Sequence, residues 1–155
     1  MGLLPTFGKK RHKFFSPEEQ KAIVDSIREA ERQTSGEIRI YVESKNPLVS
    51  PLERAGEIFF NLQMEKTEQR NAVLLYFAMK HHELAVFADE GIYRRLGKSF
   101  WDNMVQEMLA EFSSDHVCRG IVTCVGHIGE QLRKEFPYDS KTDKNELPDE
   151  IVFGH

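Results

Sequence analysis

Several kinds of segment are missing from this sequence of 155 residues. Its longest apolar runs are much shorter than the roughly 20 residues that a transmembrane helix needs. The formal net charge is -4 and no basic face dominates, which argues against general nucleic-acid binding. Glycine loops that cradle phosphates, a Gly-x-Ser-x-Gly elbow and a His-Glu-x-x-His helix are also absent. These absences argue against several common classes of nucleotide-binding and hydrolytic enzyme.

Cysteine is scarce as well. Cys118 and Cys124 fall in one expected helix, where six residues at a rise of about 1.5 Å place their Cα atoms roughly 9 Å apart. This separation is beyond the reach of a disulfide, so we expect two reduced core residues in a cytoplasmic protein. The first seven residues are too brief for a secretory signal, and their basic cluster follows them instead of preceding them.

The length predicts one domain, which buries roughly two thirds of the surface of its unfolded chain. We expect a flexible basic lead over residues 1–13, a domain over residues 14–136 and a polar, acidic tail over residues 137–155. The lead ends in Lys9-Lys-Arg-His-Lys13, which is either a hook for acidic membranes or RNA, or a solvated tail. We favour the solvated tail, without membrane contact.

The first predicted elements are a helix and a strand. Ser16-Pro-Glu-Glu19 combines an N-cap serine with proline at the first helical position and glutamate at the third, and Thr34-Ser-Gly36 ends this helix. Residues 37–43 then alternate strictly between polar and apolar, which is typical of a strand with one face toward the core. The same helix start recurs at Ser50-Pro-Leu-Glu53.

The remaining segments complete an α/β pattern. An apolar strand near residues 72–79 follows the second helix, and such a crossover makes it parallel to the first strand. The short turn at residues 80–83 makes the third strand, residues 83–88, antiparallel to the second. Two further helices are expected at about 99–112 and 115–136. Gly120, Gly126 and Gly129 lie inside the last helix, which indicates close approach to a neighbouring element.

Acidic residues gather where strands end and helices begin. Asp89 and Glu90 follow the third strand, Asp102 and Asp115 open the last two helices, and Glu37 opens the first strand. We expect several of these oxygens to meet at one edge of the sheet, where a hard cation such as Ca²⁺, which wants six to eight oxygen ligands, could bind. The alternative is that each acid caps a helix or is solvated. The residues alone leave both interpretations open.

Four short motifs in a specific order resemble a known family. They are Thr34-Ser-Gly-Glu-Ile38, Arg70-Asn-Ala-Val-Leu-Leu75, Asp89-Glu-Gly-Ile92 and Asp115-His-Val-Cys-Arg-Gly-Ile121. Over about residues 15–136 the chain resembles the TPM domain family, in a short soluble bacterial branch. The resemblance implies a three-layer α/β/α sandwich: a small mixed sheet, its first two strands parallel and its third antiparallel, covered by helices. It also implies an acidic cleft at the strand ends.

The resemblance implies the ranking of the ligands too. By position, Asp115 is the first candidate metal ligand and Asp89 and Asp102 are next, with Glu90 and Glu37 added by the strand-end argument. The sequence departs from the family at Leu62-Gln-Met-Glu65, which replaces Trp-Gly-Ile-Gly, and at Tyr93, which replaces an acid. These changes thin the acidic set.

Three functions are compatible with these observations. The first is a binding module for a divalent cation, Ca²⁺ before Mg²⁺, that acts through a protein partner of unknown identity. The second, which relatives with acid phosphatase activity suggest, is a metal-dependent phosphomonoesterase in which Arg94 or Arg95 holds the phosphate. The third is a purely structural interaction domain. We favour the first, because no residue is recognisable as an activated base, and no catalytic residue is assigned.

Overall fold

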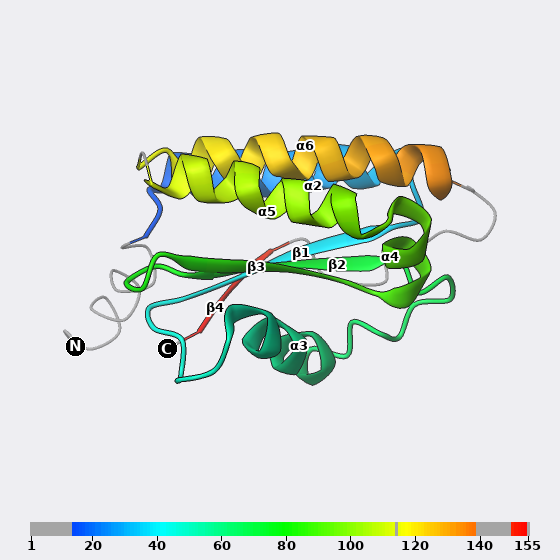
Figure 1. The fold of residues 1–155 in the computed structure, drawn as a ribbon. Helices are drawn as coiled ribbons and strands as arrows, with labels where there is room; N and C mark the ends of the chain where they lie inside the picture. Colours follow the sequence, from blue (N-terminus) through cyan, green and yellow to red (C-terminus); the bar gives the residue numbers. More distant parts are fainter. Residues whose placement is uncertain (1–13, 114, 139–149, 155) are drawn as a thin grey trace, which may run out of the picture.

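A mixed sheet forms the centre of the computed structural model, which describes residues 14–113, 115–138 and 150–154. Within these residues the strand order is β3-β2-β1-β4 (Figure 1). The strands are β1 (Glu37–Glu43), β2 (Ala72–Ala78), β3 (Glu83–Ala88) and β4 (Ile151–Phe153). β1 is parallel to both β2 and β4, whereas β3 is antiparallel to β2. The predicted pairing of the first three strands is confirmed.

Helices cover both faces of the sheet, as the three-layer prediction required (Figure 1). On one face lie α2 (Pro17–Glu31), α5 (Lys98–Ser113) and α6 (Val117–Glu135), and on the other lies α3 (Pro51–Asn61). The short helix α4 (Glu90–Leu96) links β3 to α5. None of the helices in the described part of the chain is long and apolar enough to cross a membrane.

Both predicted serine caps are present. The Ser16 Oγ accepts from the Glu19 amide over 3.1 Å, and the Glu19 side chain accepts from the Ser16 amide over 2.9 Å, which completes a capping box on α2. The Ser50 Oγ accepts from the Glu53 amide over 3.1 Å and caps α3 in the same way. These local bonds explain why the helix starts could be located from the sequence.

The core has two parts because β2 is buried on both faces, as its uninterrupted apolar run indicates. Ile38, Ile40 and Val42 of β1 pack toward α2, α5 and α6. Leu74 and Tyr76 of β2 pack on the opposite face, in the smaller core beneath α3.

β4 was not predicted. It lies in the segment expected to be a polar tail, and it adds to the free side of β1, with Ile151 beside Ile40. Three residues are too few to show a period of two, so the sequence gives little signal for such a strand. The basic lead of residues 1–13 and residues 139–149 of the expected tail lie outside the described residues.

The directions of the strands define two ends of the sheet. β1 and β2 begin at the end that we name the amino edge, and β3 finishes there because it is antiparallel. β1 and β2 finish at the opposite end, the carboxyl edge, where the turn between β2 and β3 lies. About 20 Å separates the two edges along the seven residues of β1.

Candidate functional site

The amino edge brings together segments that are far apart in the sequence. Glu37 opens β1 and is in register with Ala72 at the start of β2. Asp89 directly follows β3, and its amide donates to the Ala72 carbonyl over 2.9 Å. The loop of residues 62–71, which joins α3 to β2, ends at the same place. The start of β1, the end of β3 and this loop therefore form one candidate site.

Asp89 is firmly held at this edge. Asp89 is 3% exposed. The Arg70 Nε donates to Oδ2 over 2.7 Å, and the Arg70 Nη2 donates to Oδ1 over 2.8 Å. Oδ1 also accepts from the Glu90 amide over 2.9 Å, which makes Asp89 the N-cap of α4. The carboxylate is therefore a fixed negative charge that caps a helix, as the capping interpretation proposed.

Arg70 also joins the loop to α4 through its backbone. Its φ is 52°, a left-handed value that is uncommon outside glycine. The Arg70 carbonyl accepts from the Gly91 amide over 2.9 Å and from the Ile92 amide over 3.3 Å. A Cβ at Gly91 would lie 2.2 Å from the Gln69 carbonyl oxygen, so only glycine fits there. The glycine of the Asp-Glu-Gly motif thus serves a backbone contact.

Three carboxylates act on Arg70. Its Nη1 lies 3.5 Å from Oε1 of Glu90, whose side chain is more than half exposed. The hydrogen bonds to Asp89, together with the charges of Asp89, Glu90 and Glu65, raise the pKa of the Arg70 guanidinium above its ordinary value. One guanidinium therefore faces three carboxylates, and a further cation would be attracted here.

Two oxygens of the loop before β2 lack hydrogen-bond partners. The Glu65 Oε1 and the Thr67 Oγ1 are buried, and no described residue bonds to either atom. Leaving a buried polar atom unsatisfied costs about 1–3 kcal/mol, and more for a charged group. These residues could not be selected from the sequence, because an irregular loop has no periodicity from which burial could be inferred.

Glu37 and Arg39 add buried charge on β1. Glu37 is 2% exposed and Arg39 is 8% exposed, and their side chains point to the same face of the strand. Burial lowers the pKa of the Arg39 guanidinium, while the charges of Glu150 and Glu37 act in the opposite direction. The Arg39 Nε has no hydrogen-bond partner among the described residues. This edge thus contains both a buried donor and buried acceptors.

The other two predicted ligands are not part of this group. Asp102 lies one turn into α5, and its exposed carboxylate pairs with the Lys98 Nζ over 2.6 Å. Asp115 follows α5 with a φ of 60°. The end of α5 lies at the carboxyl edge, because the Phe112 ring stacks on His82 of the turn between β2 and β3, with ring centroids 5.2 Å apart. Of the five predicted ligands, the amino edge thus gathers Glu37, Asp89 and Glu90.

Strand ends and helix starts were expected to share one location. That holds only for strands that run the same way, and β3 runs opposite to β1 and β2. Within residues 14–113, 115–138 and 150–154, no three His, Cys, Asp or Glu side chains are grouped so that they could hold a metal ion. A cation at the amino edge would therefore need hydroxyl, carbonyl or water oxygens besides carboxylates.

A second polar cluster lies at the carboxyl edge, beneath α3. The Arg54 Nε and Nη2 donate to the two oxygens of the buried Glu43 carboxylate over 2.8 and 2.9 Å. The Tyr76 hydroxyl donates to the same carboxylate over 2.5 Å. Burial, and then the bond to Glu43, raise the pKa of the Tyr76 hydroxyl. Every group here has a partner, so the cluster holds α3 on the sheet.

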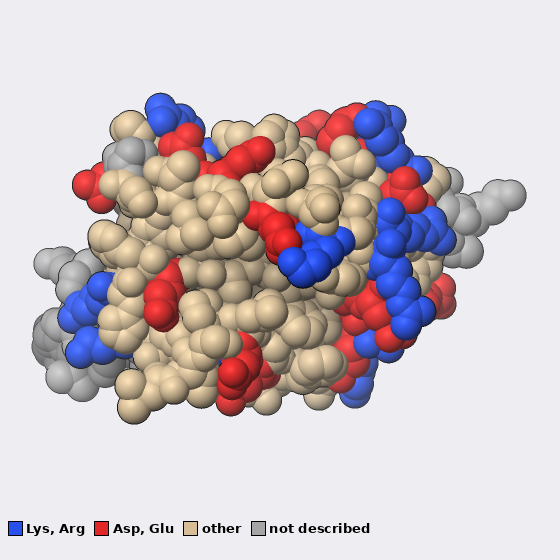
Figure 2. Space-filling view, in the orientation of Figure 1, with Lys and Arg blue, Asp and Glu red and all other residues tan. Residues whose placement is uncertain are grey.

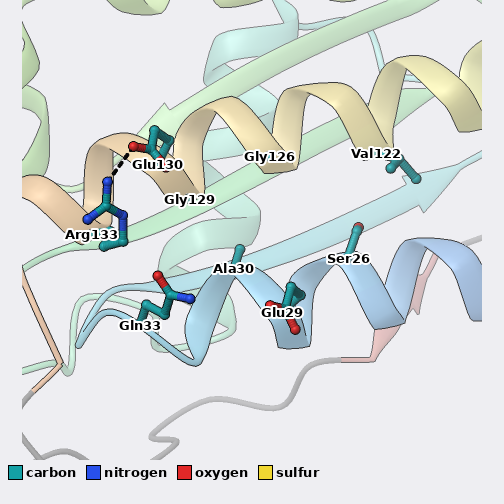
Figure 3. Close-up of a pocket in the computed structure, with 9 residues that line it drawn as sticks. All are labelled: Ser26, Glu29, Ala30, Gln33, Val122, Gly126, Gly129, Glu130 and Arg133. Carbon is teal, nitrogen blue, oxygen red and sulfur yellow. Dashed lines mark hydrogen bonds and ion pairs between the residues drawn. The ribbon is translucent and has the colours of Figure 1, made fainter.

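A shallow groove runs between α2 and α6 (Figure 3). A Cβ at Gly129 would lie 2.6 Å from the Ala30 Cβ, so the helices approach closely there. Gly126 has no atom within 4 Å of such a Cβ. The predicted packing role is confirmed for Gly129, and for Gly120 against the Glu111 side chain, but not for Gly126. Close packing explains the groove without a ligand.

A small mixed sheet between helical layers, with charged groups gathered at its amino edge, defines the chain as an α/β/α-sandwich domain. The model of the TPM domain matches residues 9–131, and the chain belongs to this family.

The solved structures that are similar to it include the following two. BA42 from the psychrophilic bacterium Bizionia argentinensis is 37% identical, with a TM-score of 0.82 over 90% of this chain and 94% of that one. The N-terminal domain of cg2496 from Corynebacterium glutamicum is 10% identical, with a TM-score of 0.61 over 91% and 84%, a likeness of fold alone. No curated protein matches the chain.

Proposed function

We propose that the chain is a divalent-cation-binding module that acts through a protein partner. The observation that supports the cation site is the pair of buried oxygens without partners, the Glu65 Oε1 and the Thr67 Oγ1, in a loop beside the carboxylates that act on Arg70. A carboxylate and a hydroxyl oxygen are ligands that hard cations accept. Glu37, at the same edge, would supply a further carboxylate.

Ca²⁺ suits this donor set better than Mg²⁺. An irregular loop supplies oxygens of mixed kind at uneven spacing, and Ca²⁺ accepts six to eight such ligands in flexible geometry. Mg²⁺ demands a near-octahedral arrangement and keeps several of its waters. When filled, the site would neutralise the carboxylates and satisfy both buried oxygens of the loop. Asp89 and Arg70 would keep the loop and α4 aligned beside it, since their bonds do not involve those oxygens.

A thermal melt of EDTA-treated protein, with Ca²⁺ and Mg²⁺ titrated separately, tests this proposal. Cation at 100 times its dissociation constant adds about 2.7 kcal/mol. In a domain of this size the midpoint should rise by about 5–11 °C. The rise should be selective for Ca²⁺ and should be lost in Glu65→Gln. The control Glu68→Gln changes an exposed residue of the same loop and should leave the rise intact. A flat response to millimolar cation contradicts the proposal.

The phosphomonoesterase alternative has weaker support. The Arg95 Nη1 donates to the Glu135 carbonyl over 2.8 Å, and its guanidinium lies 4.5 Å from the centre of the Phe136 ring. Arg95 is therefore engaged at the end of α6, which leaves the exposed Arg94 as the arginine of α4 for a phosphate. If the chain hydrolysed an aryl phosphate, and this hydrolysis required Arg94, the result would support this alternative.

A further inference from the structure

Helix α3 carries exposed apolar side chains beside its contact with β3. Leu52 is 56% exposed and Phe60 is 50% exposed. They lie eight residues apart with Gly56 midway, so all three share one face of the helix. The adjacent face of α3 buries Ala55, Ile58 and Phe59. The apolar surface of the helix thus extends beyond the area that the sheet covers.

The Phe87 ring of β3 fills the space beside Gly56. A Cβ at Gly56 would lie 3.2 Å from the Phe87 Cε2, so this ring packs directly against the helix backbone there. Phe60 meets the same ring edge to face, with centroids 5.9 Å apart. Leu52, Gly56, Phe60 and Phe87 therefore form one apolar surface, the α3 patch.

The loop before α3 also exposes a leucine side chain to solvent. Leu48 is fully exposed and has a φ of 51°, which is strained for a bulky residue. Asn46 fixes the loop, because its Nδ2 donates to the Val49 carbonyl over 2.7 Å and to the Glu83 Oε1 over 2.9 Å. Backbone strain of this kind persists only where surrounding contacts impose it, and it is frequent at functional sites.

The charges on α3 are acidic toward solvent. Glu53 and Glu57 are exposed beside the α3 patch. The guanidinium of Arg54 is bonded to Glu43, and its Nη1 also lies 3.7 Å from the Glu57 Oε1. Figure 2 shows that the surface over β3 and α3 is mostly uncharged, with isolated acidic side chains, and that Lys and Arg gather mainly toward the ends of the molecule. The flank of the patch is therefore complementary to a basic ligand.

We propose that the α3 patch docks an amphipathic helix of a protein partner, with apolar residues at helical spacing and basic residues on their flank. The apolar side chains of that helix would pack on the exposed Leu52 and Phe60, as an amphipathic helix lays its apolar face on an apolar surface. A second copy of this chain is the poorer occupant, since pairing two α3 helices places Glu53 and Glu57 against the same acids. This inference deepens the partner part of the proposed function.

Binding of synthetic helical peptides tests this proposal. The assay is done in EDTA, so a failure of peptide binding says nothing against the cation site. Likewise, a failure of the cation titration says nothing against this surface. Two fluorescent peptides with the same leucine stripe are compared by anisotropy, one with lysine and one with glutamate on its flanks. The wild-type chain should bind the lysine peptide at least tenfold more tightly than the glutamate peptide. Phe60→Asp should weaken binding at least tenfold, and Glu53→Lys with Glu57→Lys should reverse the preference.

The control is Tyr93→Ala, which removes an exposed aromatic side chain of α4 and should bind as the wild type does. The proposal would be overturned if the wild-type chain bound both peptides with equal affinity. It would also be overturned if Phe60→Asp bound the lysine peptide as tightly as the wild type does. Sedimentation of the free chain provides the remaining check. A dimer that Phe60→Asp dissociates would show that a second copy is the occupant, and would overturn the proposal as well.

Discussion

Arg70 links three parts of the amino edge in one residue. Its side chain holds the buried carboxylate of Asp89, its carbonyl accepts the first amides of α4, and its backbone adopts a left-handed conformation to do both. A buried ion pair contributes little net stability relative to apolar residues, but the loss of one partner leaves an uncompensated charge. Arg70 therefore acts chiefly by keeping Asp89 and the loop in place.

Arg70→Met should destabilise the fold by about 3 kcal/mol, at the lower end for a buried pair because the Arg70 side chain is 38% exposed. The control Lys98→Met breaks an exposed ion pair with Asp102, with a similar distance between N and O, and should leave the free energy of unfolding nearly unchanged. Urea unfolding of both variants measures the difference. Equal losses would show that the Asp89 pair behaves as a surface contact.

The two cysteines should differ in reactivity. Burial, and then the charge of Glu107, raise the pKa of the Cys124 thiol to about 12, whereas Cys118 is partly exposed and its pKa is raised less. At pH 9 iodoacetamide should therefore modify Cys118 first and leave Cys124 untouched until the chain unfolds. Peptide mass spectrometry distinguishes the two sites. Equal rates in the folded protein would contradict the buried position of Cys124.

The raised pKa of the Cys124 thiol also predicts how the free energy of unfolding changes at alkaline pH. The unfolded thiol ionises near its ordinary pKa of about 8.5, while the folded thiol stays protonated to about 12. The native state then binds more protons than the unfolded state, so the free energy of unfolding should fall as pH rises through this range.

At the scale of elements, the contact between α2 and α6 depends on one glycine. Gly129→Ala places a methyl group 2.6 Å from the Ala30 Cβ, so the helices must separate, at a cost of about 1–3 kcal/mol. Gly126→Ala meets no atom within 4 Å and should stabilise the helix by up to about 1 kcal/mol. Thermal melts of the two variants should move in opposite directions, and a loss of stability in both would contradict this packing.

Elements defined by local chemistry could be predicted from the sequence. The Ser16 and Ser50 caps depend on bonds within four residues, and the alternation of β1 depends on burial of one face. β4 could not be predicted, because its three residues gain their place only by pairing with β1. Local patterns thus located helices and long strands but not an added edge strand.

The candidate site was less predictable than the fold. Asp89 and Glu90 follow a strand in the sequence, but which edge they reach depends on the direction of that strand, and the same holds for Asp115 at the far end of α5. Glu65 and Thr67 lie in a loop whose burial arises from tertiary contacts. Charge and residue type alone therefore identified three of the acids at the amino edge and missed the unsatisfied oxygens beside them.

At the scale of the whole molecule, the sheet separates two kinds of polar group. The carboxyl edge is internally satisfied, with Glu43 bonded by both Arg54 and Tyr76. The amino edge carries the carboxylates that act on Arg70 and buried oxygens without protein partners in the described part of the chain. The α3 patch lies on a third surface, the outer face of the smaller core. A module that binds a cation at one end and a partner on one face is consistent with this division.

Titration calorimetry with Ca²⁺ tests the central claim most directly, because it measures the cation site without reference to stability. The EDTA-treated wild-type chain should show saturable binding, and Asp115→Asn should bind with unchanged affinity because Asp115 lies at the opposite end of the sheet. Glu65→Gln should reduce the affinity at least tenfold. Binding that survives Glu65→Gln but is lost in Asp115→Asn, or no binding at all, would contradict a cation site at the amino edge.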